Sequence, residues 1–446
     1  MSSQPESHSS NKPNQSGMHN PSSPTDSSGE TASAAMDSTK PASSRAAIGF
    51  ILVTLFLDIL GIGLIIPVLP EIVKLLTKDT EYVPSFVYGL MIGCYALAQF
   101  LAAPVIGAMS DRFGRRPVLL LSILGLSIDF LLTYLAPNLT WLFVARIASG
   151  ITAANITASN AYIADISSPQ NRIKNFGLSG ATIGIAFVIG PAIGGFLGQS
   201  DPRHPFLVAS ILCGLNFIYG CFVLPESLPP EKRAKKLKIN AVPFAAIFQL
   251  RSYPVVFTLA ITIFCCVLAQ QALQSTWILY TGERFGWKPL QNGLSMTAVG
   301  VTTFIMQAGL IRAITGKLGP RKSLFCGLAA GSLAHLAYGL ATEGWMMYLI
   351  MCIGCFAGLI QPVSQATIAR LVPSDRQGAV QGSIASLGSI AAFVAPPFAT
   401  GLFGYFTDPD TAIYLPGISF FFGSLCIFLG ALNALRIRKQ LEEKVG

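Results

Sequence analysis

A long succession of apolar segments of similar length constrains the fold of this chain more than any other feature. We expect twelve membrane-spanning helices, over residues 47–70, 86–108, 117–137, 140–164, 175–198, 206–225, 254–282, 290–315, 321–342, 345–371, 377–404 and 412–436. Each is long enough to cross about 30 Å of hydrocarbon, which requires about 20 helical residues. Only 11% of the residues are charged, far fewer than in soluble domains. The sequence therefore predicts an all-α membrane protein.

The twelve segments divide into two groups of six around a polar stretch. We expect an N-terminal six-helix bundle over residues 46–225, a cytoplasmic linker over residues 226–253 and a C-terminal six-helix bundle over residues 254–436. Residues 1–45 are rich in Ser, Pro, Asn and Gly, so they cannot bury enough apolar surface to fold and should form a disordered tail. Residues 437–446 should form a cytoplasmic tail.

Basic residues are distributed unevenly between the two sides of the membrane. With both termini in the cytoplasm, five of the 30 Lys and Arg residues lie outside, namely Lys74, Lys78, Arg203, Arg284 and Lys288. Arg146 and Arg312 lie within or at the ends of helices, which leaves 23 on the cytoplasmic side. Because Lys and Arg are enriched in cytoplasmic loops, this bias predicts the orientation. The same pattern accounts for the net charge of +9 without a nucleic-acid partner.

The two halves also contain related short sequences. Ile163-Ala-Asp165 with Pro169-x-x-Arg172 recurs as Ile368-Ala-Arg370 with Pro373-x-x-Arg376. Two six-helix repeats around a central cavity are typical of transporters in which one half rocks against the other. A membrane-embedded enzyme would instead need clustered His, Asp or Glu residues on interfacial loops, and the sequence has no such cluster. A receptor or sensor that binds a ligand without transporting it is the alternative from another class.

Two acidic residues, Asp58 and Asp129, fall deep within predicted helices. At about 1.5 Å per residue, each lies roughly 17–18 Å from the cytoplasmic end of its helix. A carboxylate at this depth should face the protein interior or a water-filled cavity, where it can take part in proton transfer. The alternative is a structural carboxylate that neighbouring hydroxyl groups or an arginine satisfy. Arg146, which is always protonated, likewise needs a partner or water inside the membrane.

A short charged turn, Gly107-Ala-Met-Ser-Asp-Arg-Phe-Gly-Arg-Arg-Pro117, joins the second and third apolar segments. Its arginines could simply anchor the loop in the cytoplasm. That explanation does not account for Asp111, or for glycines that permit a tight turn. The pattern resembles the loop 2–3 signature of the major facilitator superfamily, in which the loop latches the cytoplasmic gate. The resemblance assigns this role to Gly107, Asp111, Arg112, Gly114, Arg115 and Arg116.

Two further patterns extend the resemblance. The sequence Gly190-Pro191-Ala-Ile-Gly194-Gly195 is similar to the helix 5 signature of the antiporter branch, and this similarity supports export. The alternative is that the proline bends the helix and the glycines let it pack closely, with no bearing on the direction of transport. The surroundings of Arg146 resemble the helix 4 signature of proton-coupled members, where the arginine is linked to proton transfer. Arg146 could instead form only a structural ion pair.

The segment Asp58-x-x-Gly-Ile-Gly63-Leu-Ile-x-Pro67 closely resembles bacterial tetracycline efflux proteins, and the likeness extends over roughly residues 47–410. It implies a drug:proton antiporter that works by alternating access. Protonation of Asp58 or Asp129, helped by Arg146, would drive the reset after drug release. The partners would be a small-molecule drug, protons and the lipid bilayer. We expect a monomer in the bacterial inner membrane, with no cofactor and no metal site of its own.

The second half departs from that family. Tetracycline efflux proteins often carry a membrane histidine in helix 8 and an aspartate in helix 9, where this chain has Thr303 and Gly331. His335, one turn beyond Gly331, is either a replacement or a packed core residue. We expect the second half to contribute Thr303, Gln307, His335, Gln361 and Gln365 to the substrate cavity. A metal–tetracycline chelate is then less expected as substrate than a neutral amphipathic compound, and export of an unrelated metabolite is the runner-up.

Overall fold

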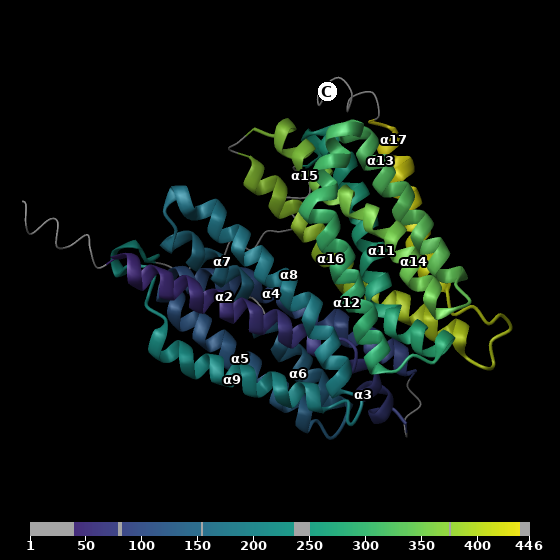
Figure 1. The fold of residues 1–446 in the computed structure, drawn as a ribbon, viewed down its shortest axis with the longest axis horizontal. Helices are drawn as coiled ribbons and strands as arrows, with labels where there is room; N and C mark the ends of the chain where they lie inside the picture. The colour runs from purple at the N-terminus through teal and green to yellow at the C-terminus, as the bar shows by residue number, and fades with distance from the viewer. Residues whose placement is uncertain (1–39, 79–82, 153–154, 236–249, 374–375, 438–446) are drawn as a thin grey trace, which may run out of the picture. The chain divides into compact units, whose positions relative to one another are not determined.

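The helices of this computed structural model follow the apolar segments of the sequence (Figure 1). The structure describes residues 40–78, 83–152, 155–235, 250–373 and 376–437. The expected disorder of the N-terminal tail, much of the linker and nearly all of the C-terminal tail therefore lie outside the described residues. Residues Ala46–Gly446 form one compact unit.

The first half of this unit consists of helices joined by short connections. They are α2 (Lys40–Ile65), α3 (Leu69–Leu76), α4 (Pro84–Phe113), α5 (Arg115–Leu135), α6 (Leu139–Thr152), α7 (Asn155–Ile166), α8 (Pro169–Leu197) and α9 (His204–Val223). The predicted segment 47–70 is divided, because α2 ends before Pro67, which has no backbone N–H for a helix. The short helix α3 follows.

The second half is also a succession of helices. It contains α11 (Pro254–Phe285), α12 (Pro289–Ile305), α13 (Ile311–Leu340), α14 (Gly344–Gly354), α15 (Ile360–Leu371), α16 (Gln377–Thr407) and α17 (Ile418–Leu435). A π-helical turn, Met306–Leu310, joins α12 to α13, and a 3₁₀ turn, Cys355–Leu359, joins α14 to α15.

Within the described residues, ten helices are long and apolar enough to cross a membrane. In the predicted segment 140–164 the structure describes α6 and α7, and residues 153–154 between them lie outside the described residues. The predicted segment 290–315 begins with α12, which has 17 residues and ends at the π-helical turn. The protein is thus an all-helical, multi-pass membrane protein, and the count of twelve stays a prediction.

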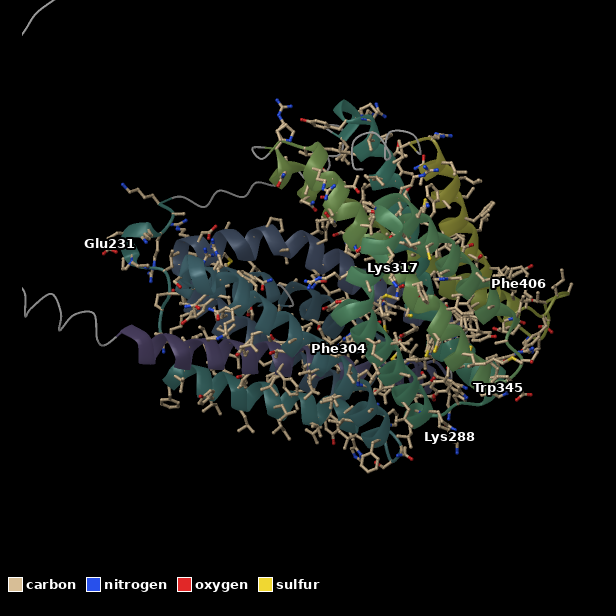
Figure 2. The ribbon with its side chains drawn as sticks, turned by 45° about the horizontal axis from the view of Figure 1, so that its top comes forward. Glu231, Lys288, Phe304, Lys317, Trp345 and Phe406 are labelled. Carbon is tan, nitrogen blue, oxygen red and sulfur yellow. The ribbon has the colours of Figure 1, made fainter. Side chains whose placement is uncertain are left out.

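Many large apolar side chains point away from the interior, as expected for helices surrounded by lipid. Phe304 and Trp345, labelled in Figure 2, are 60% and 59% exposed. Charged residues labelled in the same view, Glu231 and Lys288, lie in connections between helices. This distribution fits a bilayer, because an apolar surface of this extent would be costly in water.

Two polar pairs hold equivalent helices together in the two halves. In the first half, the Asn216 amide of α9 donates to the Thr54 hydroxyl of α2 at 3.2 Å. In the second half, the Asn433 amide of α17 donates to the Thr262 hydroxyl of α11, also at 3.2 Å. Both interactions join the first and the last long helix of a half. Polar contacts of this kind stabilise helix pairs inside a membrane.

A reciprocal serine pair also occurs once in each half. The hydroxyls of Ser127 on α5 and Ser210 on α9 each donate to the other residue's carbonyl oxygen at 2.8 Å. Ser332 on α13 and Ser424 on α17 do the same at 3.2 and 2.9 Å. Each half therefore contains one such pair, between its last long helix and a neighbouring helix.

The two halves contact each other mainly through α4 with α16 and through α8 with α12. Glycines permit the close approach. A side chain at Gly89 of α4 would collide with Pro396 and Thr400 of α16. On the other side, the Thr297 hydroxyl of α12 donates to the Val188 carbonyl oxygen of α8 at 2.7 Å. These contacts set the width of the space between the halves.

Candidate functional site

A cavity of about 400 Å³ lies between the two halves. Helices α2, α4, α5, α6 and α8 form one wall, and α11, α12 and α16 form the other. Its lining is mostly apolar and aromatic. The polar residues on it are Asp58, Tyr88, Tyr95, Gln99, Arg146, Ser149, Gln270, Gln271, Gln274 and Ser275. This volume and this mixture are typical of a site for a drug-sized molecule, for which pockets of about 300–1,000 Å³ are usual.

The first-half wall contains a buried ion pair. Arg146 Nη2 of α6 lies 3.0 Å from Asp129 Oδ2 of α5, and their side chains are 8% and 0% exposed. The same nitrogen donates to the Thr133 hydroxyl at 3.1 Å, one helical turn beyond Asp129. Two residues that the sequence places on separate helices thus meet. Pairing is required here because an isolated charge inside a membrane is costly.

Asp58 lies on the same cavity, on α2, and is 3% exposed. Tyr95 of α4 also lines the cavity, as do Asp58 and Arg146. Asp58, Asp129 and Arg146 therefore form one group at the first-half wall. This arrangement is compatible with proton binding and also with a purely structural ion pair.

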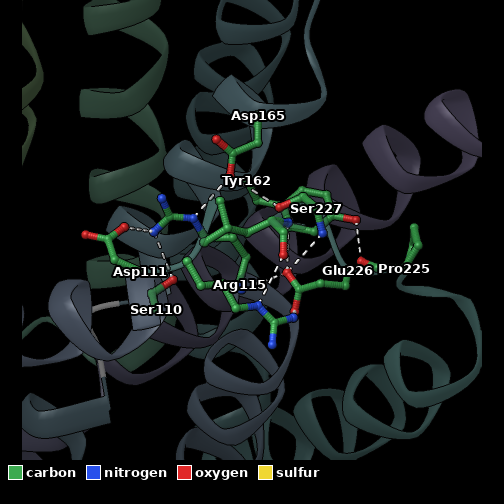
Figure 3. Close-up of polar contacts among 10 residues, drawn as sticks. Ser110, Asp111, Arg115, Tyr162, Asp165, Pro225, Glu226 and Ser227 are labelled. Carbon is green, nitrogen blue, oxygen red and sulfur yellow. Dashed lines mark hydrogen bonds and ion pairs between the residues drawn. The ribbon is translucent and has the colours of Figure 1, made fainter. Parts of the chain in front are cut away.

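The charged turn between α4 and α5 is organised around Arg115 (Figure 3). Its guanidinium lies 2.6 Å from Asp111 and 3.1 Å from Asp165 at the end of α7, and donates to Ser110 at 3.2 Å. The turn itself depends on Gly114, whose φ of 104° favours glycine. Of the remaining predicted gate residues, Arg116 donates to the Cys221 carbonyl oxygen at 2.7 Å, and the Arg112 guanidinium lies 5.3 Å from the centre of the Phe113 ring. Among the described residues, Gly107 and Arg112 take no part in the hydrogen bonds and ion pairs around Arg115.

The start of the linker is bound to this turn. One carboxylate oxygen of Glu226 accepts hydrogen bonds from the backbone N–H groups of Arg115, Ser227 and Leu228 at 2.9–3.0 Å. The Ala234 N–H donates to the Asp111 carbonyl oxygen at 2.9 Å. Sequence reasoning missed Glu226 because it lies beyond the motif, although an acid that directly follows a membrane helix is a usable signal. The turn, α7 and the linker are thus joined in one polar network.

The glycine-rich part of α8 fits between two neighbours. Gly190 and Gly194 face the backbone of α2, and Gly195 faces Pro289 at the start of α12. Pro191 lies inside the helix and contacts the position of Gly293 on α12. Larger residues at these places would force the helices apart. The motif therefore acts at a contact between the two halves.

The second-half residues that we expected in the substrate cavity do not line it. Thr303, Gln307 and Gln361 are exposed, and Gln365 accepts a hydrogen bond from Gln381 at 2.5 Å. His335 is 6% exposed, and its Nδ1 lies 2.8 Å from the Gly331 carbonyl oxygen. None of the five belongs to the described residues that line the cavity. Their part in substrate binding stays a prediction.

Sequence reasoning missed the residues that the second half does contribute. Gln270, Gln271 and Gln274 of α11 line the cavity, together with Trp277. Three carboxamides within five residues of an otherwise apolar segment are a usable signal, because uncharged polar groups in membrane helices usually face protein or water. Among the described residues, no group of three or more His, Cys, Asp or Glu side chains is placed to hold a metal ion.

Comparisons with known proteins agree with these features. The family model described as Major Facilitator Superfamily matches residues 51–396 and 259–444. The class C tetracycline resistance protein of Escherichia coli is 36% identical, over 88% of this chain and 97% of its own length. The class G tetracycline resistance protein of Vibrio anguillarum is 34% identical, over 78% and 88%.

Solved structures share the fold at lower identity. The human organic anion transporter MFSD10 (TETRAN) has a TM-score of 0.64 and 23% identity, over 88% of this chain and 99% of its own. An inward-facing, unoccupied bacterial homolog of the human lysosomal transporter Spinster has a TM-score of 0.70 and 14% identity, over 91% and 99%. The sequence motifs, the family match over most of the chain and the helical fold lead to one conclusion: the chain belongs to the major facilitator superfamily of membrane transporters.

Proposed function

We propose that this chain is a proton-coupled exporter of tetracycline-like or other amphipathic compounds, working by alternating access in the bacterial inner membrane. Its relatedness to tetracycline resistance proteins supports the substrate class. The observation that carries the proposal is the charged group at the cavity wall, in which Asp129 and Arg146 are paired 3.0 Å apart and Asp58 lies on the same cavity.

The proton step follows from the chemistry of this group. When Asp129 binds a proton, its attraction to Arg146 is lost, and the guanidinium must find another partner because it stays charged. Asp58, on the same cavity, can supply one, and Arg146 then occupies the carboxylate that a basic group of the drug would otherwise use. Proton binding at Asp129 and drug binding at Asp58 thereby exclude each other. Such competition couples the two without direct contact between the proton and the drug.

Alternating access would use the two ends of the bundles in turn. Gly89 lies near the start of α4 and Gly114 just after its end, so the two are about 37 Å apart at about 1.5 Å per residue. At the Gly89 end, α4 packs tightly against α16 of the other half. At the Gly114 end, the contacts of the polar network within the described part of the chain join the turn to first-half elements and the linker. We place the Gly114 end in the cytoplasm, with both termini, and infer that it is the open end.

We also propose that two six-helix halves, over residues 46–225 and 254–436, are related repeats that rock against each other. The paired hydrogen bonds of α2 with α9 and of α11 with α17 support this division. So does the positive φ of Gly319, which breaks the helical geometry inside α13 within Gly316-Lys-Leu-Gly319-Pro-Arg-Lys322, a sequence similar to the turn at Gly114, where φ is also positive.

The test is proton-driven uptake of tetracycline by inverted membrane vesicles. Asp58→Asn and Asp129→Asn should each insert normally but lose uptake driven by a proton gradient. Both variants should retain more of the exchange of labelled for unlabelled drug than of the gradient-driven uptake, because exchange needs no net proton movement. Asp410→Asn, in an exposed loop, is the matched control and should behave like the unchanged protein. Full gradient-driven uptake by both single variants would overturn the proposal.

A further inference from the structure

Three glutamines of α11 form a polar strip on the second-half wall of the cavity. Gln270 and Gln274 are one helical turn apart, so they project from the same face, and Gln271 lies beside them. Gln270 and Gln274 are exposed to the cavity, although their neighbours Ala269 and Ser275 are buried. We refer to Gln270, Gln271 and Gln274 as the carboxamide strip.

The hydrogen-bonding groups of this strip are not used by the protein. In the described part of the chain, none of the three side chains has a hydrogen bond or an electrostatic partner. Each carboxamide offers two N–H donors and an oxygen acceptor. Polar side chains in a largely apolar surrounding are costly unless something bonds to them. Water or a bound molecule must therefore complete the strip.

The surroundings of the strip narrow the choice of ligand. Trp277 lies one turn beyond Gln274 on the same helix and lines the cavity, as do Phe130 and Phe187 from the other half. These aromatic rings favour a flat apolar ligand body. The charged residues of the cavity, Asp58 and Arg146, belong to the opposite wall. The strip itself carries no charge, so it cannot neutralise a cation.

We propose that the carboxamide strip determines substrate specificity by binding the polar edge of an uncharged or zwitterionic ring compound. That edge would carry alternating carbonyl and hydroxyl or amide groups, which match groups that both donate and accept. A metal-free drug fits this description better than its cationic metal chelate. This inference rests on the proposed function for the identity of the cavity as the transport site.

The experiment measures equilibrium binding of radiolabelled tetracycline to the purified full-length protein in lipid nanodiscs, with EDTA and separately with magnesium. Gln270→Leu and Gln274→Leu each replace a carboxamide side chain with an apolar one. Each should weaken binding of the metal-free drug about 2- to 12-fold, the usual range for one net hydrogen bond. Gln274→Glu should shift the preference towards the magnesium chelate.

A matched control distinguishes a specific effect from a general one. Gln199→Leu changes an exposed glutamine beyond the end of α8, whose amide donates to the Phe196 carbonyl oxygen. It should leave binding unchanged, and thermal unfolding should show that all variants are folded. Affinity within twofold of the unchanged protein for both α11 variants would overturn the inference, as would no binding in EDTA. If drug binding depends on the strip but the protein shows no proton-driven transport, the proposed function is overturned and the inference about the strip is not.

Discussion

Removing one member of the Asp129–Arg146 pair should destabilise the folded protein more than removing both members. Arg146→Leu leaves a carboxylate with no exposed surface and no cationic partner. Removing one member of a buried pair costs about 3–5 kcal/mol, whereas replacing both by apolar residues is often neutral or stabilising. We therefore expect Arg146→Leu to lower the unfolding temperature markedly, and the double variant Asp129→Leu/Arg146→Leu to recover most of the loss.

Thermal unfolding of the purified protein in detergent, followed by intrinsic fluorescence, measures this difference. The pair Arg233–Glu226 is the matched control, because its atoms are 3.6 Å apart and its side chains are 30% and 24% exposed. Solvent-accessible pairs contribute at most about 1 kcal/mol, so Arg233→Leu should shift unfolding little. Equal stability of Arg146→Leu, the double variant and the unchanged protein would refute the reasoning.

Three further predictions concern transport. Asp111→Asn should slow turnover and leave drug binding nearly unchanged, because Asp111 pairs with Arg115 in the polar network of the α4–α5 turn and does not line the cavity; a comparison of transport rate with equilibrium binding tests this. Gly89→Leu should push α4 away from α16, so that thiol reagents added from outside label cysteines introduced at cavity positions more extensively. Gly49→Leu, which has open space around it, should not change this labelling. Gly331→Asp puts an acid where the tetracycline efflux proteins often have one, but a side chain there would meet Ala357 and Ile427 and not the cavity, so the ratio of tetracycline uptake with magnesium to uptake without it should stay unchanged.

The helical fold and the first-half site could be predicted from the sequence because their signals are local. Long apolar segments mark the helices, and a carboxylate such as Asp58 or Asp129 inside one has few acceptable positions. Whether Asp129 pairs with Arg146 depends on how α5 and α6 pack against each other, which is not a local feature of the sequence. The structure brings the two together, since α5 and α6 pack with these residues facing each other.

The second-half site was harder to predict because it depends on the rotation of each helix about its axis. The positions of Thr303 and Gln307 were inferred by matching them to a related family. Gln307 lies in a π-helical turn, which changes the side of the helix on which the following residues emerge. A glutamine in an apolar segment does not indicate by itself which side of the helix faces the cavity, since Gln307 and Gln361 do not line it, whereas the three glutamines of α11 do. His335 illustrates the same limit, since a histidine in an apolar segment can line a cavity or bond to its own helix, as it does here.

The central claim is that drug and protons move in opposite directions through the same protein. The most direct measurement uses proteoliposomes that contain the purified protein and a pH-sensitive dye, with no initial pH difference. A tetracycline gradient imposed across the membrane should drive protons against the drug, so the internal pH should change with a sign that reverses when the gradient is reversed. Asp129→Asn proteoliposomes should show no such change. Drug flux through the unchanged protein without any proton movement would contradict the account.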